Sequence, residues 1–262
     1  MTIFSLQLAF RCKFKLFVAL FSRKKRRKAM KKILACFVLG WVTATPSHAQ
    51  FDPARLIPET LRYRLQSGSA EVGSSTVTIS HDNANGTIHI VESISGLFEQ
   101  TAIVTIRNDT SLRPLTSQAV FSRDNQYHEV QLHYSSDGQR VTGEVRRPPG
   151  YGGGGMIDVT FPNAAADVYA APHLLRASPL LIGKIIQFPL FNVLQNEKSL
   201  ARAWVAKIET VAVAAGRFEC FRLESFLGNS RLILNIDTQF PHRIIRQILP
   251  ELQVKFELAK VE

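Results

Sequence analysis

Alternating apolar and polar residues fill most of the chain after residue 50, and short turn-forming stretches separate them. Residues 74–80 and 87–93 (SSTVTIS and TIHIVES) flank the polar stretch HDNANG, whose Asp, Asn and Gly residues tolerate the positive φ angles of tight turns. A period of two predicts a strand with one buried face, because successive side chains point to opposite sides of a sheet. This part of the sequence therefore predicts a β-hairpin.

Strands of the same kind recur along the chain at intervals of about ten residues. They include residues 60–68, 98–108, 115–124, 127–135, 201–214, 217–226 and 231–237. About 11 or 12 such strands must bury one face of the sheet and protect its edges. We predict an all-β fold: an antiparallel curved sheet or incomplete β-barrel, crossed by a short helical or loop segment.

The crossing segment is expected within residues 167–192, the most apolar stretch of the body of the chain. Pro172, Pro179 and Pro189 divide it into short pieces. At most one or two helical turns fit between these prolines, because proline disrupts a helix interior. We therefore expect a short helix or loop from Pro172 to Leu181.

Two interpretations of this apolar segment stay open. It is either ordinary core or a cover over an apolar ligand, such as a lipid acyl chain, on the concave face of the sheet. The residues predicted to contact such a ligand are Leu174, Leu175, Arg176, Leu180, Leu181, Ile185, Phe188 and Phe191. We also expect Asp167 and Arg176 to pair and to fix the segment against the sheet.

The distribution of charge argues against a nucleic-acid partner. The formal net charge is +11, but the first 49 residues contain 7 Lys, 4 Arg and no acidic residue. From residue 50 onward the chain contains 21 basic and 21 acidic residues. The body is therefore neutral, without the excess of positive charge that nucleic acids require.

The first 49 residues are predicted to be an N-terminal extension, residues 1–29, followed by a signal peptide, residues 30–49. Two lysines precede the apolar run of residues 33–42, and small residues precede a predicted cleavage site after Ala49. A run of about ten apolar residues is too short for a membrane-spanning helix, which needs about 20. We expect an exported, periplasmic protein whose mature chain has no transmembrane segment.

The remaining chain, residues 50–262, is predicted to be a single β-rich domain. It retains one cysteine, Cys220, so an internal disulfide is excluded. Cys220 lies on a predicted strand with no histidine nearby in sequence, and we interpret it as a small apolar side chain of the core. His128 and His133 are five residues apart on a predicted strand and so face opposite sides. We predict no metal site, no catalytic residue and no cofactor.

Several segments together resemble a family of bacterial exported proteins, the domain of unknown function 3108. The residues that carry the resemblance are Val72, Gly73, Asp167, Arg176, Leu180 or Leu181, Gly183, Lys184, Ala215, Gly216, Phe218, Asp237 and Pro241. The Gly150–Gly155 loop and the Phe188-Pro189 segment depart from the family pattern. The resemblance implies a barrel-like periplasmic fold, structural roles for Asp167, Gly183, Gly216, Phe218, Asp237 and Pro241, and no assigned activity.

The function that the sequence favours is non-enzymatic: an envelope protein with a binding or structural role, with an apolar small molecule or lipid as the expected ligand. The alternative is an envelope hydrolase whose site is assembled from separate strands, and a third reading is a scaffold in an envelope assembly. The sequence indicates no particular protein partner.

Overall fold

The structure is a computed structural model that describes residues 50–123, 126–148, 154–193 and 195–262. The chain divides into two units, residues 1–47 and 48–262, and the described residues belong to the second. The strands are β1 (Glu59–Ser67), β2 (Ala70–Asp82), β3 (Thr87–Gly96), β4 (Glu99–Arg107), β5 (Pro114–Arg123), β6 (Gln126–Tyr134), β7 (Arg140–Arg146), β8 (Gly155–Thr160), β9 (Ala166–Asp167), β10 (Ile185–Asn192), β11 (Glu197–Val213), β12 (Gly216–Leu227), β13 (Ser230–Asp237), β14 (Ile244–Leu249) and β15 (Val254–Val261). The described helices are α3 (Ala171–Ala177) and two 3-10 turns, η1 (Pro53–Arg55) and η2 (Pro250–Leu252).

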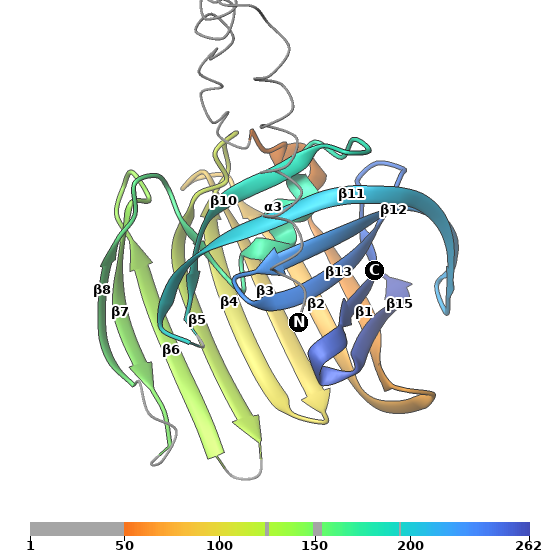
Figure 1. Cartoon of the computed structure of the whole chain (residues 1–262), viewed down its shortest axis with the longest axis horizontal. Coiled ribbons are helices and arrows are strands. Elements are labelled where there is room, and N and C mark those ends of the chain that lie inside the picture. The colour runs from red at the N-terminus through yellow and green to blue at the C-terminus, as the bar shows by residue number, and fades with distance from the viewer. Residues whose placement is uncertain (1–49, 124–125, 149–153, 194) are drawn as a thin grey trace, which may run out of the picture. The chain divides into compact units, whose positions relative to one another are not determined.

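All fifteen strands form one curved sheet in the order β8-β7-β6-β5-β4-β3-β2-β1-β15-β14-β13-β12-β11-β10-β9 (Figure 1). The first and last strands pair in the middle of this sheet, with Leu61 opposite Val261. The two edges, β8 and β9, remain unpaired with each other, so the sheet is not closed. The predicted fold, an incomplete barrel with a short crossing helix, is confirmed.

The sheet contains fifteen strands instead of about 11 or 12, partly because the apolar segment contributes β9 and β10. Strand β10 pairs with β11 along its length, and with β9 only at Leu190 and Phe191. Pro189 therefore lies where one side of the strand needs few hydrogen bonds, which is where a sheet tolerates proline. The predicted short helix or loop from Pro172 to Leu181 contains α3, which begins one residue earlier and ends four residues earlier than these bounds.

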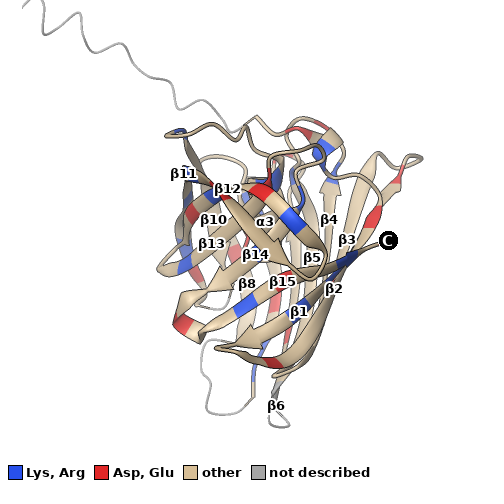
Figure 2. Cartoon of the chain, turned by 90° about the vertical axis from the view of Figure 1, so that its right-hand side faces the viewer, with Lys and Arg blue, Asp and Glu red and all other residues tan. Residues whose placement is uncertain are grey.

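The concave face of the sheet forms the core. On β3, Ile88, Ile90 and Ile94 are buried on the same face, as the period of two predicts. Figures 1 and 2 show α3 inside the curve, between β3 and β4 on one side and β11 to β13 on the other. Full burial of Leu174 or Leu175 of α3 contributes about 1.5–3 kcal/mol each, so apolar contacts hold the helix within the sheet.

Acidic and basic residues are interspersed along the strands and loops of the sheet (Figure 2). Several ion pairs among the described residues have both side chains exposed, as in the pair Arg140–Asp158. No helix in the described part of the chain is long and apolar enough to cross a membrane.

Candidate functional site

The N-terminal end of α3 is fixed by Asp167, a fully buried carboxylate. Its Oδ1 accepts hydrogen bonds from the backbone N–H groups of Tyr169 (2.7 Å) and Ala170 (3.0 Å). Its Oδ2 accepts hydrogen bonds from the hydroxyls of Tyr134 (2.6 Å) and Ser117. Four donors compensate the loss of hydration of this carboxylate, which joins the start of the helix to β5 and β6.

The C-terminal end of α3 is fixed by a second buried carboxylate, Glu59 of β1. Arg176, which is 1% exposed, donates to Glu59 Oε1 at 2.6 Å, and Arg243 donates to Glu59 Oε2 at 2.6 Å. The predicted pair between Asp167 and Arg176 is therefore wrong. The two residues lie at opposite ends of the helix, and each has its own buried partners.

A cavity of about 370 Å³ lies between α3 and the two halves of the sheet. One side comes from β3 to β5, the second from the chain around α3, and the third from β12 to β15. The lining residues are Glu92, Ile94, Phe98, Gln100, Phe121, Val168, Tyr169, Pro172, Asn192, Leu227, Ser230, Arg231, Leu232, Gln247, Leu249, Glu251, Leu252 and Phe256. The rings of Phe98 and Phe121 lie 5.2 Å apart, so the lining is aromatic on the β3–β5 side. This volume falls in the range of small-molecule sites.

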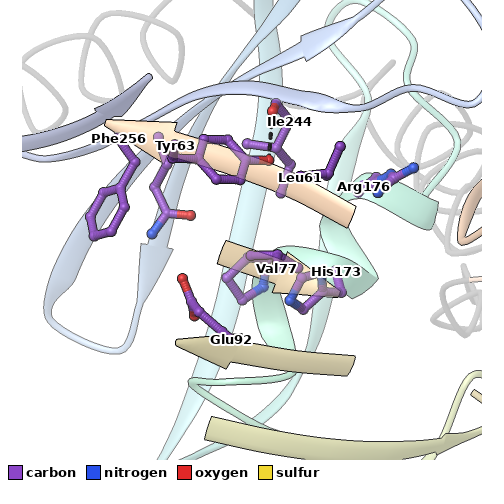
Figure 3. A pocket seen from close by; sticks show the side chains of 10 residues that line it. Leu61, Tyr63, Val77, Glu92, His173, Arg176, Ile244 and Phe256 are labelled. Atoms are coloured by element: carbon purple, nitrogen blue, oxygen red, sulfur yellow. Dashed lines mark hydrogen bonds between the residues drawn. The ribbon is translucent and has the colours of Figure 1, made fainter. Parts of the chain in front are cut away.

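A smaller chamber of about 30 Å³ adjoins this cavity, and the two share Glu92, Pro172, Gln247 and Phe256. Figure 3 shows Glu92 and His173 on one side of the chamber and Tyr63 and Phe256 on the other. The Tyr63 hydroxyl donates to the Ile244 carbonyl at 2.9 Å. The chamber has room for about one water-sized group.

Burial shifts the pKa values of four titratable groups of the chamber: those of Glu92 and Tyr63 upward and those of His173 and Arg176 downward. Burial raises the pKa of Glu92 to about 7, and one weak contact, the Ser75 hydroxyl at 3.3 Å, acts in the opposite direction. Burial and the nearby Arg176 charge lower the pKa of His173 to about 3, so its imidazole is neutral at physiological pH. His173 Nδ1 is buried and has no hydrogen-bond partner in the described part of the chain.

The eight residues predicted to contact a ligand are spread over three environments. Leu174, Leu175, Leu180, Phe188 and Phe191 are buried in the core, whereas Leu181 and Ile185 are exposed. Arg176 lines the small chamber. The described lining of the larger cavity includes none of the eight, but it includes Val168, Tyr169 and Pro172 from the same apolar segment.

Sequence reasoning missed Glu92, although the pattern held a signal for it. Glu92 lies on β3 in phase with Ile88, Ile90 and Ile94, which face the core. A carboxylate on the apolar face of a strand is unusual, because an unpaired charge is costly to bury. That position marks Glu92 as a candidate functional residue.

The residues that the resemblance marks as structural take several roles. Gly183 and Gly216 have φ angles of +76° and +140°, which favour glycine. Phe218 packs against the main core. Asp237 Oδ1 accepts from the Gln239 N–H at 3.0 Å, and the Pro241 carbonyl lies 3.5 Å from Arg176.

Cys220 and the histidines show no catalytic arrangement in the described hydrogen bonds. Cys220 is fully buried, and burial raises its pKa to about 12, so the thiol is protonated. His81 contacts the Leu56 carbonyl, and His242 contacts the Asp237 carbonyl. His89 lies between the Thr87 and Thr105 hydroxyls. No described group of three or more His, Cys, Asp or Glu side chains is arranged to hold a metal ion.

Two predictions lie outside the described residues: the signal peptide with its cleavage site after Ala49, and the central part of the glycine-rich loop, residues 149–153.

Comparison with solved structures finds a similar fold in a β-barrel-like protein of domain of unknown function DUF1849 from Brucella abortus. The TM-score is 0.50 at 11% identity, covering 80% of this chain and 98% of the other. A Bacteroides fragilis protein with a YmcC-like fold aligns at 9% identity over 82% of this chain and 99% of its own, with a TM-score of only 0.28. No curated protein matches the chain significantly.

The family model described as protein of unknown function (DUF3108) matches residues 62–247. This match covers most of the sheet, from β1 to β14, together with α3. It confirms the resemblance drawn from the sequence, and the chain belongs to the DUF3108 family of proteins of unknown function.

Proposed function

We propose that this protein is an exported, non-enzymatic component of the cell envelope that binds an apolar or lipid ligand inside its curved sheet. The 370 Å³ cavity beside α3 carries this proposal. Ile94, Phe98, Phe121 and Leu232 give it apolar walls, and a few polar groups, including Glu92, interrupt them. Preformed, mostly apolar cavities with a few converging polar groups are typical of small-molecule sites.

The proposed ligand position differs from the one expected from sequence. The ligand lies beside the N-terminal end of α3 and contacts Val168, Tyr169 and Pro172. The leucines of α3 itself belong to the core beneath. Leu252, which is 61% exposed, lies at the rim and provides an apolar surface for ligand entry.

Export is the second part of the proposal, and the pattern of residues 30–49 supports it: two lysines, an apolar run of secretory length and small residues before position 50. Cleavage after Ala49 would leave residues 50–262 as the single mature domain in the periplasm.

Native mass spectrometry of the protein purified from its own periplasm tests both parts of the proposal, export and ligand binding. We expect a chain that begins at Gln50 and carries a co-purifying mass of lipid size. A chain that begins upstream of Gln50 would contradict the signal-peptide prediction.

A pair of tryptophan substitutions tests the ligand position. Gln100→Trp places a large ring on the inner face of β4, where Gln100 lines the cavity. Gln118→Trp on the neighbouring strand β5 is the matched control, because Gln118 is exposed. The neutral fluorescent amine N-phenyl-1-naphthylamine serves as the probe. We expect Gln100→Trp to weaken probe binding at least about tenfold by filling the cavity, while Gln118→Trp binds as the wild type does. Equal binding by both variants would contradict this ligand position.

A further inference from the structure

The two chambers adjoin each other, and together they offer an apolar part and a polar end. The large cavity supplies most of the apolar walls, and the small chamber brings Glu92, His173 and Tyr63 to its far side. Four lining residues are common to both, and two of these, Glu92 and Gln247, are polar. A ligand with an apolar body and a small polar head group matches this division.

The polar end contains hydrogen-bonding groups that the described residues leave unsatisfied. His173 Nδ1 is buried and has no partner. Glu92 accepts one long hydrogen bond on Oε1, and its Oε2 accepts none from the described residues. Buried polar groups in folded proteins are almost always hydrogen-bonded. The buried, unpartnered His173 Nδ1, in the same chamber as the half-buried Glu92 carboxylate, therefore indicates the position of a polar group that is supplied from outside the chain.

The charges at the polar end determine which head group fits. The described arginines that line the two chambers, Arg176 and Arg231, each have a carboxylate partner, but Arg176 shares the Glu59 carboxylate with Arg243, and its buried Nε has no partner among the described residues. Arg176 pairs with Glu59 at 2.6 Å, and Arg231 pairs with Glu224 at 2.7 Å. His173 is neutral, because burial lowers its pKa to about 3. An anionic head group that reaches Glu92 thus meets a carboxylate whose one described hydrogen-bond donor is the neutral Ser75 hydroxyl, and two like charges in a partly dehydrated space repel strongly.

We infer that the cavity selects an amphiphile whose head group is uncharged and donates hydrogen bonds, such as a long-chain alcohol or a monoacylglycerol, in preference to a fatty-acid anion. A head-group hydroxyl donates to Glu92 and accepts or donates at His173 Nδ1, according to the tautomer. The acyl or alkyl chain lies against Phe98, Phe121 and Leu232. This inference rests on the proposed function, which places an apolar ligand in the cavity, and it adds the chemistry of the head group.

The test compares decan-1-ol with decanoate, which have the same chain length and differ at the head group. Each displaces N-phenyl-1-naphthylamine from the full-length protein at a pH slightly above neutral. We expect decan-1-ol to bind at least about tenfold more tightly than decanoate, because Glu92 repels the carboxylate of decanoate. Equal binding, or tighter binding of decanoate, would overturn the inference and leave the proposed function standing.

Glu92→Gln provides the second measurement, with Glu99→Gln on the adjacent strand as the exposed control. Removing the carboxylate should strengthen decanoate binding and reduce the preference for the alcohol to about twofold or less. Glu99→Gln should keep the wild-type ratio. An unchanged ratio in Glu92→Gln would show that Glu92 does not face the head group. If the probe and both amphiphiles fail to bind the wild-type protein, the proposed function fails together with the inference.

Discussion

The buried polar groups around α3 fall into two sets that differ in how completely the chain satisfies them. The anchoring carboxylates, Asp167 and Glu59, receive four hydrogen bonds and two arginine contacts, respectively. The cavity pair, Glu92 and His173, has one hydrogen bond of 3.3 Å and an unpartnered Nδ1. Asp167, Glu59 and His173 are buried and Glu92 is half-buried, but only the anchoring carboxylates have a full set of partners among the described residues.

This difference separates residues that build the site from residues that are available to a ligand. A satisfied buried network stabilises one arrangement of its elements, whereas an unsatisfied buried group lowers stability. Natural proteins accept such a loss mainly at functional sites. The anchoring carboxylates fix α3 at both ends, and the cavity pair faces the space that the fixed helix leaves open.

Removing an anchoring carboxylate should give the largest change in the free energy of unfolding. Glu59→Ala leaves Arg176, at 1% exposure, with only the Pro241 carbonyl 3.5 Å away. We expect the free energy of unfolding to fall by about 3–5 kcal/mol, because an uncompensated charge remains buried. Urea denaturation measures the change. Asp158→Ala, which breaks the exposed pair with Arg140, is the control and should change the midpoint far less.

The second anchoring carboxylate should give a smaller effect that depends on the replacement. Asp167→Ala leaves the buried Tyr134 and Ser117 hydroxyls without their acceptor. It also leaves two backbone N–H groups before α3 without a hydrogen-bond partner. We expect a loss of about 2–4 kcal/mol. Asp167→Asn retains an oxygen for the N–H groups, so its loss should be about half as large in the same urea experiment. Equal losses for both variants would show that neither the size of the side chain nor the oxygen retained by asparagine accounts for the stabilisation, and would contradict this prediction.

The alternating pattern was enough to predict the sheet, because each strand buries one face and the turns carry their own residue types. Hairpin β2–β3 is an example: Asp82 accepts hydrogen bonds from the Ala84 and Asn85 N–H groups, as a turn-forming Asp does. The same rule placed Cys220 on a strand, and it is buried in the core. The prolines limited the apolar segment to the short helix α3.

The site was less accessible to sequence reasoning, because its residues come together only through the curvature of the sheet. Glu92 and Gln247 belong to strands separated by about half of the chain, and the order of pairing brings β3 and β14 to opposite sides of one space. Glu59 was missed as the partner of Arg176 for the same reason, since 117 residues separate them. Asp167 is the carboxylate closest to Arg176 in sequence. Helix α3 separates the two, because Asp167 lies before its first residue and Arg176 lies in its last turn.

Glu92 and His173 should change the free energy of unfolding in opposite directions as the pH changes. Glu92 has its pKa raised to about 7 by burial, so its contribution to stability is full at low pH and is lost as the pH rises through 7. His173 has its pKa lowered to about 3, so the unfolded state gains protons below about pH 6.5 that the folded state does not. In wild-type protein these two effects oppose each other between about pH 4.5 and pH 6.5, where the two titration ranges overlap.

Glu92→Gln separates the two effects. We expect the variant to match wild-type stability at pH 5 and to exceed it by about 2 kcal/mol at pH 8, where the wild type must bury a charged carboxylate. Tyr63 and Tyr169 also lie near Glu92, but burial raises the pKa of both, so they stay neutral in this window. The charged groups Arg176, Arg231 and Glu251 line the same space in both proteins and cancel in the comparison.

Urea midpoints at the two pH values measure the difference, with Glu99→Gln as the control that should follow the wild type. A constant offset between Glu92→Gln and the wild type would mean that Glu92 is already hydrated or paired in solution. The contrast with the anchoring carboxylates would then disappear. A gap that is wider at pH 8 than at pH 5 would mark Glu92 as a carboxylate that the fold leaves without a charged partner, available to a hydroxyl from a ligand.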